Sequence, residues 1–272
     1  MPITADCHLH SIHSGDSDTP MEDMIQAGIR QGLSAMCFTE HMDIGFPDSP
    51  EGPGSIFLLD TEAYLGQAAQ FKADFQDQIL LLSGVELGLQ ADYAEAIQAY
   101  AASYPFDFII GSSHVCHGRD PYYPSFYQGR RQEEAYLEYF ESILENIQLF
   151  SAFDVYGHLD YAVRYGPDRD RNYTYETYRD IFDAILRLLI EKGKGIELNT
   201  GGLKAGMRDV HPCTAVLRRY RELGGEILTI GSDAHSPEHV ATSFSRAAAV
   251  LEACGFRYYT VYEGRKPRFC QL

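Results

Sequence analysis

Short apolar runs alternate with amphipathic segments along most of the chain. The runs are continuous and several are bounded by Gly or Pro, which is typical of strands buried on both faces of a parallel sheet. The first predicted strand leads into Asp6. We predict further strands at residues 35–39, 79–89, 106–113, 153–158, 195–199, 226–232 and 257–262.

The segments between these runs carry apolar residues at the three- and four-residue spacing of amphipathic helices. The sequence Thr19-Pro20-Met21-Glu22 fits a capping box with Pro at the first helical position, and Gly32 fits the C-terminal cap of the same helix. The apolar faces of these helices are expected to pack in the core. We predict further helices over residues 64–75, 136–147, 178–189, 212–223 and 236–251.

The alternation of strand and helix predicts an α/β fold with a parallel sheet. Seven or eight such units favour a barrel over an open sheet, and 272 residues suit one barrel domain spanning residues 1–272. Active sites of such barrels lie at the C-terminal ends of the strands. Residues with catalytic or metal-binding side chains should therefore follow the apolar runs.

Residues that commonly bind metal ions do follow six of the predicted strands. They are His8, His10, His41, Glu86, His114, His158, Asp233 and His235. His8 and His10 are two residues apart, so they share one side of an extended strand. Imidazole with carboxylate suits Zn²⁺, Mn²⁺ or Fe²⁺ better than Ca²⁺ or Mg²⁺. With one further carboxylate, this set exceeds the about four to six ligands of one ion, so two or three ions are expected.

The order of these motifs resembles the polymerase and histidinol phosphatase (PHP) family. The motifs are HxH at His8–His10, TEH ending at His41, a lone Glu86, SxH ending at His114, GH at His158 and SDAH ending at His235. The resemblance extends from Asp6 to His235 and implies a distorted (β/α)7 TIM-like barrel with a trinuclear metal centre. It implies these ligand sets: His8, His10, Glu86 and Asp233 for the first ion; Glu86, His114 and His158 for the second; Asp16, His41 and His235 for the third.

Several roles in the implied site have more than one candidate. Asp16 stands eight residues after His8, at the position of a third-ion ligand in the family, and His13 is a rival by proximity. We expect a hydroxide between the first two ions to attack phosphorus. Asp233 or His235 would then act as the general acid.

Within the family, residues 197–204 are similar to the members that hydrolyse L-histidinol phosphate in histidine biosynthesis. Lys204 stands where Arg is common, and Gly201 where Ser is common. The substrate phosphate needs cationic partners, for which Arg suits the planar geometry. The candidates for phosphate contacts are Arg164, Lys204, Arg208 and His117.

Composition narrows the possible partners. The chain has 22 Lys and Arg against 39 Asp and Glu, a net charge of −17, which argues against nucleic acid. No apolar run is long enough for a membrane span, and the N-terminus lacks the features of a signal peptide. The six cysteines form no CxxC pair, which predicts reduced thiols and a cytoplasmic location. The sequence leaves the oligomeric state open.

Three alternative functions stay open on the sequence. The chain could act on another small phosphomonoester or on phosphotyrosine. Amidohydrolase-like barrels also begin with HxH, but they often bridge their ions with a carboxylated Lys, where this chain offers Glu86. A non-catalytic metal-binding domain is the third alternative.

Overall fold

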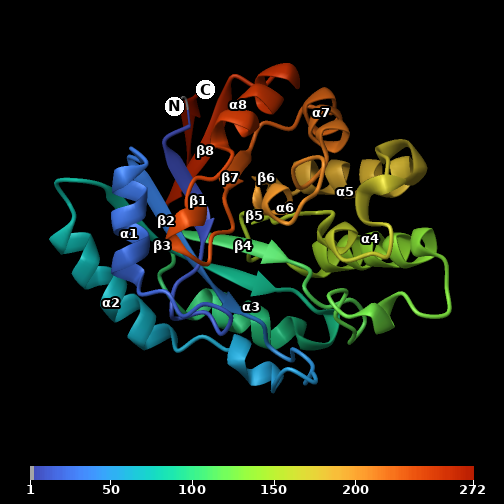
Figure 1. Cartoon of the computed structure of the whole chain (residues 1–272), viewed down its shortest axis with the longest axis horizontal. Coiled ribbons are helices and arrows are strands. Elements are labelled where there is room, and N and C mark those ends of the chain that lie inside the picture. The colour runs from blue at the N-terminus through green and yellow to red at the C-terminus, as the bar shows by residue number, and fades with distance from the viewer. Residues whose placement is uncertain (1–2) are drawn as a thin grey trace.

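The computed structural model describes residues 3–272, and within them seven parallel strands form one sheet in chain order (Figure 1). The chain after the last strand returns to the first: His10 N donates to Ala234 O, and Asp233 N donates to His8 O, both at 2.8 Å. The sheet is therefore a nearly closed barrel, as predicted. Its strands are β1 (Ala5–Leu9), β2 (Ala35–Met42), β3 (Leu80–Gly88), β4 (Phe108–Ser112), β5 (Val155–Tyr156), β6 (Gly195–Asn199) and β7 (Leu228–Gly231).

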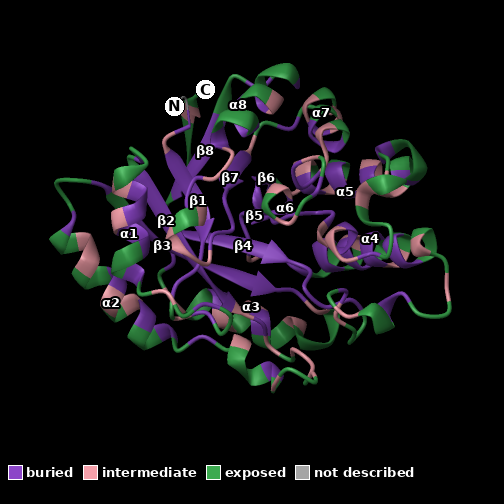
Figure 2. Ribbon diagram, in the orientation of Figure 1, coloured by how far each residue is buried: buried purple, intermediate pink, exposed green. Residues whose placement is uncertain are grey.

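Burial explains why these strands appear as short apolar runs. Every residue of β1, β4, β5, β6 and β7 is buried, because the barrel interior covers one face and the surrounding helices cover the other (Figure 2). Polar residues within these strands therefore need partners inside the protein.

The helices surround the sheet, as the labels in Figure 1 show. Their buried faces follow the predicted spacing; in α1, for example, Met24 and Ile25 are fully buried. Within residues 3–272, no helix has both the length and the apolar character that crossing a membrane requires. The helices are α1 (Met21–Arg30), α2 (Thr61–Asp74), α3 (Ala94–Ser103), α4 (Gln132–Leu149), α5 (Arg179–Glu191), α6 (Gly201–Lys204), α7 (Thr214–Glu222) and α8 (Phe244–Ala253).

Two predicted helix starts are wrong, and the two errors have different causes. Thr19 makes no cap on α1, because its hydroxyl donates to His235 O at 2.9 Å. The helix predicted from residue 236 begins only at Phe244. Before it, Ala241 and Ser243 take positive φ values of 55° and 63°, which interrupt the helix.

Two further elements differ from the predicted pattern. The run at 257–262 lies outside the parallel sheet, because β8 (Tyr258–Glu263) pairs antiparallel with β9 (Lys266–Gln271). Helix α3 has no counterpart among the predicted helices. Only Ile97 and Ala101 of that helix are buried, so its apolar stripe is too narrow to identify from spacing.

Candidate metal centre

The ligand residues predicted for the first ion meet at the C-terminal ends of the strands. His8 Nε2 lies 3.1 Å from both His10 Nε2 and Glu86 Oε2. Asp233 Oδ1 completes the set at 3.8 Å from His8 Nε2 and 3.6 Å from His10 Nε2. Ligands of a tetrahedral zinc ion with bonds of about 2.0–2.1 Å lie about 3.3 Å apart. The ligand atoms of His8, His10 and Asp233 all lie within 4.8 Å of one another, as the ligands of one metal ion do, and Glu86 Oε2 lies beside His8.

Glu86 also reaches the second predicted set through its other oxygen. Its Oε1 lies 3.1 Å from His114 Nε2 and 2.9 Å from His158 Nε2. Ser112 Oγ donates to the same oxygen at 2.6 Å, which holds the carboxylate in place. The two Glu86 oxygens therefore face two ligand sets, as a bridging carboxylate must.

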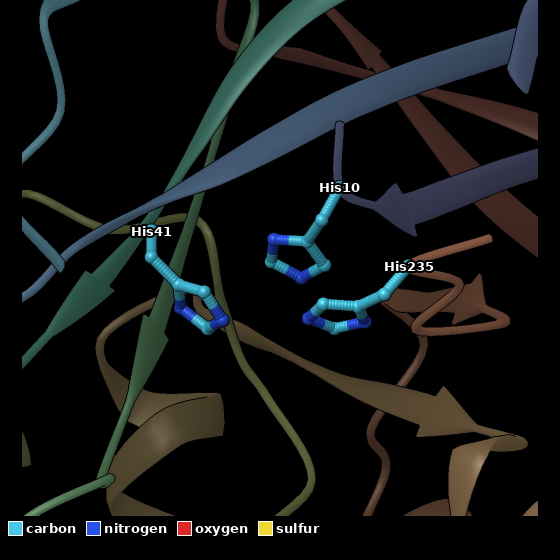
Figure 3. A group of neighbouring side chains, drawn as sticks. All are labelled: His10, His41 and His235. Atoms are coloured by element: carbon cyan, nitrogen blue, oxygen red, sulfur yellow. The ribbon is translucent and has the colours of Figure 1, made fainter. Parts of the chain in front are cut away.

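The third set forms around Asp16, which comes from the loop after β1. Its Oδ2 lies 3.1 Å from His235 Nε2 and 3.5 Å from His41 Nε2. Figure 3 shows the rings of His10, His41 and His235 close together, carried by three separate segments of the chain. The rival candidate His13 lies outside this set, and its Nε2 donates to the side chain of Gln67 at 2.8 Å.

The charges and unpaired atoms of this cluster fit divalent metal ions. Burial and the neighbouring His235 and His41 rings lower the pKa of His10 to about 3. Within residues 3–272, the buried Nε2 of His235 makes no well-aligned hydrogen bond, although Asp16 Oδ2 lies 3.1 Å away. Burial disfavours the charged form of His114, but adjacent carboxylates raise its pKa to about 10. A metal ion would satisfy the unpaired nitrogens and balance the buried carboxylates.

A second layer of side chains fixes the orientation of the imidazoles. His8 Nδ1 donates to Glu197 Oε1 at 2.6 Å, and His114 Nδ1 donates to Asp43 Oδ1 at 2.7 Å. His10 Nδ1 donates to the hydroxyl of Ser14 at 3.0 Å. Each of these bonds turns Nε2 toward the ligand sets, as metal-binding histidines require.

Residue spacing alone does not predict that Glu197, Asp43 and Ser14 orient metal ligands, although the sequence contains a signal for Glu197. Glu197 lies in the middle of a predicted strand, so a buried charge there needs partners. The roles of Ser14 and Asp43 depend on contacts across strands, which residue spacing does not reveal.

A cavity of about 290 Å³ opens above the ligand sets, a volume that suits a small molecule. Arg164 lines it, with Nη2 at 3.5 Å from Asp233 Oδ2. The other three predicted phosphate contacts lie elsewhere. Lys204 and Arg208 are exposed outside the cavity. The His117 ring is bound to Glu138 and Glu145 instead.

Comparisons with known proteins identify the family of this chain. The model of the PHP domain family matches residues 6–201. Histidinol-phosphatase of Lactococcus lactis subsp. lactis is 32% identical over 262 residues, which cover 96% of this chain and 95% of that protein. A probable histidinol-phosphatase of Clostridium acetobutylicum is 30% identical over 254 residues, which cover 93% of this chain and 94% of that protein.

A solved structure also resembles this chain over almost its whole length. The crystal structure of histidinol phosphate phosphatase from Lactococcus lactis, complexed with Zn, L-histidinol and phosphate, matches with a TM-score of 0.87 at 31% identity. The match covers 97% of this chain and 98% of that one. The chain therefore belongs to the PHP domain family.

Proposed function

We propose that the protein is a metal-dependent phosphatase that hydrolyses L-histidinol phosphate to L-histidinol and inorganic phosphate. The observation that carries this proposal is the bridging position of Glu86, beneath a cavity that Arg164 also lines. The Lactococcus relative, solved with Zn, L-histidinol and phosphate, supports the choice of substrate. A place in histidine biosynthesis and a cytoplasmic location follow from this proposal.

The nine predicted ligands are the residues that would hold two or three divalent ions. Zn²⁺, Mn²⁺ and Fe²⁺ all suit imidazole and carboxylate ligands. When bound, such ions lower the pKa of water and neutralise phosphoryl oxygens.

The side chains of the cavity supply the remaining functions. The Arg164 guanidinium can donate two parallel hydrogen bonds to phosphate oxygens. Burial opposes the ionised form of Asp233, but His8, His10 and Arg164 hold its pKa well below the usual range. Asp233 is therefore ionised at neutral pH and is placed to accept the proton of the attacking water. Asp233 can then return that proton to the leaving oxygen. We assign His235, the other candidate for the general acid, to the third ligand set, because its Nε2 lies 3.1 Å from Asp16 Oδ2.

The test is phosphate release by metal-loaded protein from L-histidinol phosphate, beside a nucleoside monophosphate, a sugar phosphate and phosphotyrosine. We expect a kcat/KM above about 10⁴ M⁻¹s⁻¹ for L-histidinol phosphate, in the usual enzyme range. For the other esters, kcat/KM should be at least about a hundredfold lower than for L-histidinol phosphate. Broad, weak turnover would exclude this substrate, and no release despite bound metal would exclude phosphatase chemistry.

A further inference from the structure

A second group of potential metal ligands lies between α4 and the turn that follows β4. Its members are Cys116, His117 and Glu138, whose ligand atoms all lie within 4.8 Å of one another. His117 Nδ1 is 3.9 Å from Cys116 Sγ and 3.2 Å from Glu138 Oε1. In a tetrahedral zinc site these two separations are about 3.6 Å and about 3.3 Å. The group therefore has nearly the spacing of a zinc site, and it shares no residue with the predicted metal centre.

A tight turn holds the His117 ring against α4. Cys116 and Arg119 exchange two backbone hydrogen bonds, of 2.8 Å and 3.0 Å, around His117 and Gly118. Both central residues have positive φ, 48° for His117 and 73° for Gly118, as a type I′ turn requires. The turn leaves Cys116 fully buried and the His117 side chain 46% exposed. An ion from solution can therefore reach the ring, with the thiol behind it.

The second nitrogen of the His117 ring has the partner that a metal-binding histidine needs. His117 Nε2 donates to Glu145 Oε2 at 2.9 Å. Glu138 and Glu145 are seven residues apart in α4, about two helical turns, so they lie on one side of the helix. Metal-binding histidines commonly donate their other ring N–H to a carboxylate. Glu145 would thus direct the lone pair of Nδ1 toward Cys116 and Glu138.

The charge around this group suits a cation. Arg119 and Arg130 both bind Glu138, with Arg119 Nη2 at 2.5 Å from Oε1. The charges of Glu138 and Glu145 balance those two guanidinium groups. Helix α4 carries further Glu residues and no Lys or Arg, so the surrounding surface is negative. The Cys116 thiol would bind the ion as the thiolate, and its proton would pass to solvent.

We propose that Cys116, His117 and Glu138 bind one divalent ion such as Zn²⁺. Thiolate, imidazole and carboxylate are the ligand types that Zn²⁺ takes in proteins, whereas Ca²⁺ and Mg²⁺ take oxygen ligands. The ion would fasten the turn after β4 to α4. His114 is two residues before Cys116, so the ion would also steady the segment that carries a predicted ligand of the metal centre. This second site goes beyond the proposed function and does not depend on it.

The test uses Co²⁺ as a probe, added to the metal-free full-length protein under reducing conditions. The predicted ligands of the metal centre contain no sulfur, so a thiolate-to-cobalt charge-transfer band in the near ultraviolet reports only on a cysteine site. We expect this band in the wild type and its loss in Cys116→Ser. Cys254→Ser, which changes another buried cysteine, is the matched control and should keep the band.

Two further variants test the histidine and its partner without changing a buried residue. His117→Asn removes the imidazole but keeps a residue type that tolerates the left-handed conformation. Glu145→Gln removes the charge behind the ring. Both should weaken cobalt binding, measured by titration of the band, by about 10- to 100-fold.

Three results would each overturn the second site. They are the absence of the band in the wild type, an unchanged band in Cys116→Ser, and unchanged cobalt affinity in both His117→Asn and Glu145→Gln. Because the readout is a spectrum rather than phosphate release, none of these results would bear on the proposed function.

Discussion

Glu197 is a buried carboxylate that supports two predicted ligands, His8 in β1 and His158 just after β5. Its Oε1 accepts from His8 Nδ1, while its Oε2 accepts from His158 N at 3.1 Å. His158 has an unusual backbone conformation, with φ at 20°, and its N–H bond to Glu197 restrains that conformation. The side chain therefore positions ligands of both the first and the second predicted ions.

The variant Glu197→Gln should bind Zn²⁺ about 10- to 100-fold more weakly, as is typical when a second-layer partner of a metal ligand is lost. The amide can still accept one hydrogen bond, but it gives His8 no negative charge. Competition with a chelator of known affinity measures the change. Glu191→Gln, at the exposed end of α5, is the control. Equal zinc affinity in both variants would show that Glu197 has no such role.

At the residue scale, the sequence predicts which candidate ligands come together but does not predict the side chains that orient them. The ligands follow predictable strand ends, so their convergence follows from barrel topology. Arg164 lies in the same cavity, whereas His117, Lys204 and Arg208 do not, because a loop residue's position depends on the path of its loop.

At the scale of elements, Asp6 joins the first strand to the last part of the barrel. Its Oδ1 accepts from Ser232 N at 2.9 Å, and its Oδ2 accepts from Ala241 N at 3.0 Å. Asp6 is fully buried in β1, and both donors lie after β7. The contact between Asp6 and Ala241 explains why the predicted final helix is interrupted before Phe244.

At the scale of elements, apolar runs in the sequence predict the strands. The long-range contact of Asp6 has no signature in residue spacing, so the interruption of the final helix could not be predicted.

We expect Asp6→Ala to lower the free energy of unfolding by about 1–3 kcal/mol or more, because it leaves buried N–H groups without an acceptor. Urea denaturation of the metal-free protein measures this loss separately from any change in metal binding. Asp77→Ala, at an exposed position after α2, should change stability by less than about 0.5 kcal/mol. If the two variants were equally stable, Asp6 would not be needed to close the barrel.

At the scale of the whole molecule, the metal centre connects most strands of the barrel. Its predicted ligands come from β1, β2 and β3 and from the segments after β1, β4, β5 and β7. Bound ions should therefore stabilise the whole fold, since binding only the folded state adds about 2.7 kcal/mol at a hundredfold excess over Kd.

Chelation should accordingly lower the melting temperature by several degrees, and added Zn²⁺ should restore it. Differential scanning calorimetry of the chelated and the zinc-loaded protein measures the shift. A Glu86→Gln variant should show a smaller shift, because it loses charge at two ligand sets. An unchanged melting temperature at saturating zinc would contradict a metal centre that links the strands.

The most direct test of the metal centre is a crystal structure of the zinc-loaded protein with anomalous data at the zinc edge. We expect three peaks: one beside His8, His10 and Asp233, one beside His114 and His158, and one beside Asp16, His41 and His235. Glu86 should lie between the first two peaks, with one oxygen toward each. A single peak, or peaks that lie away from Glu86, would contradict the bridged centre.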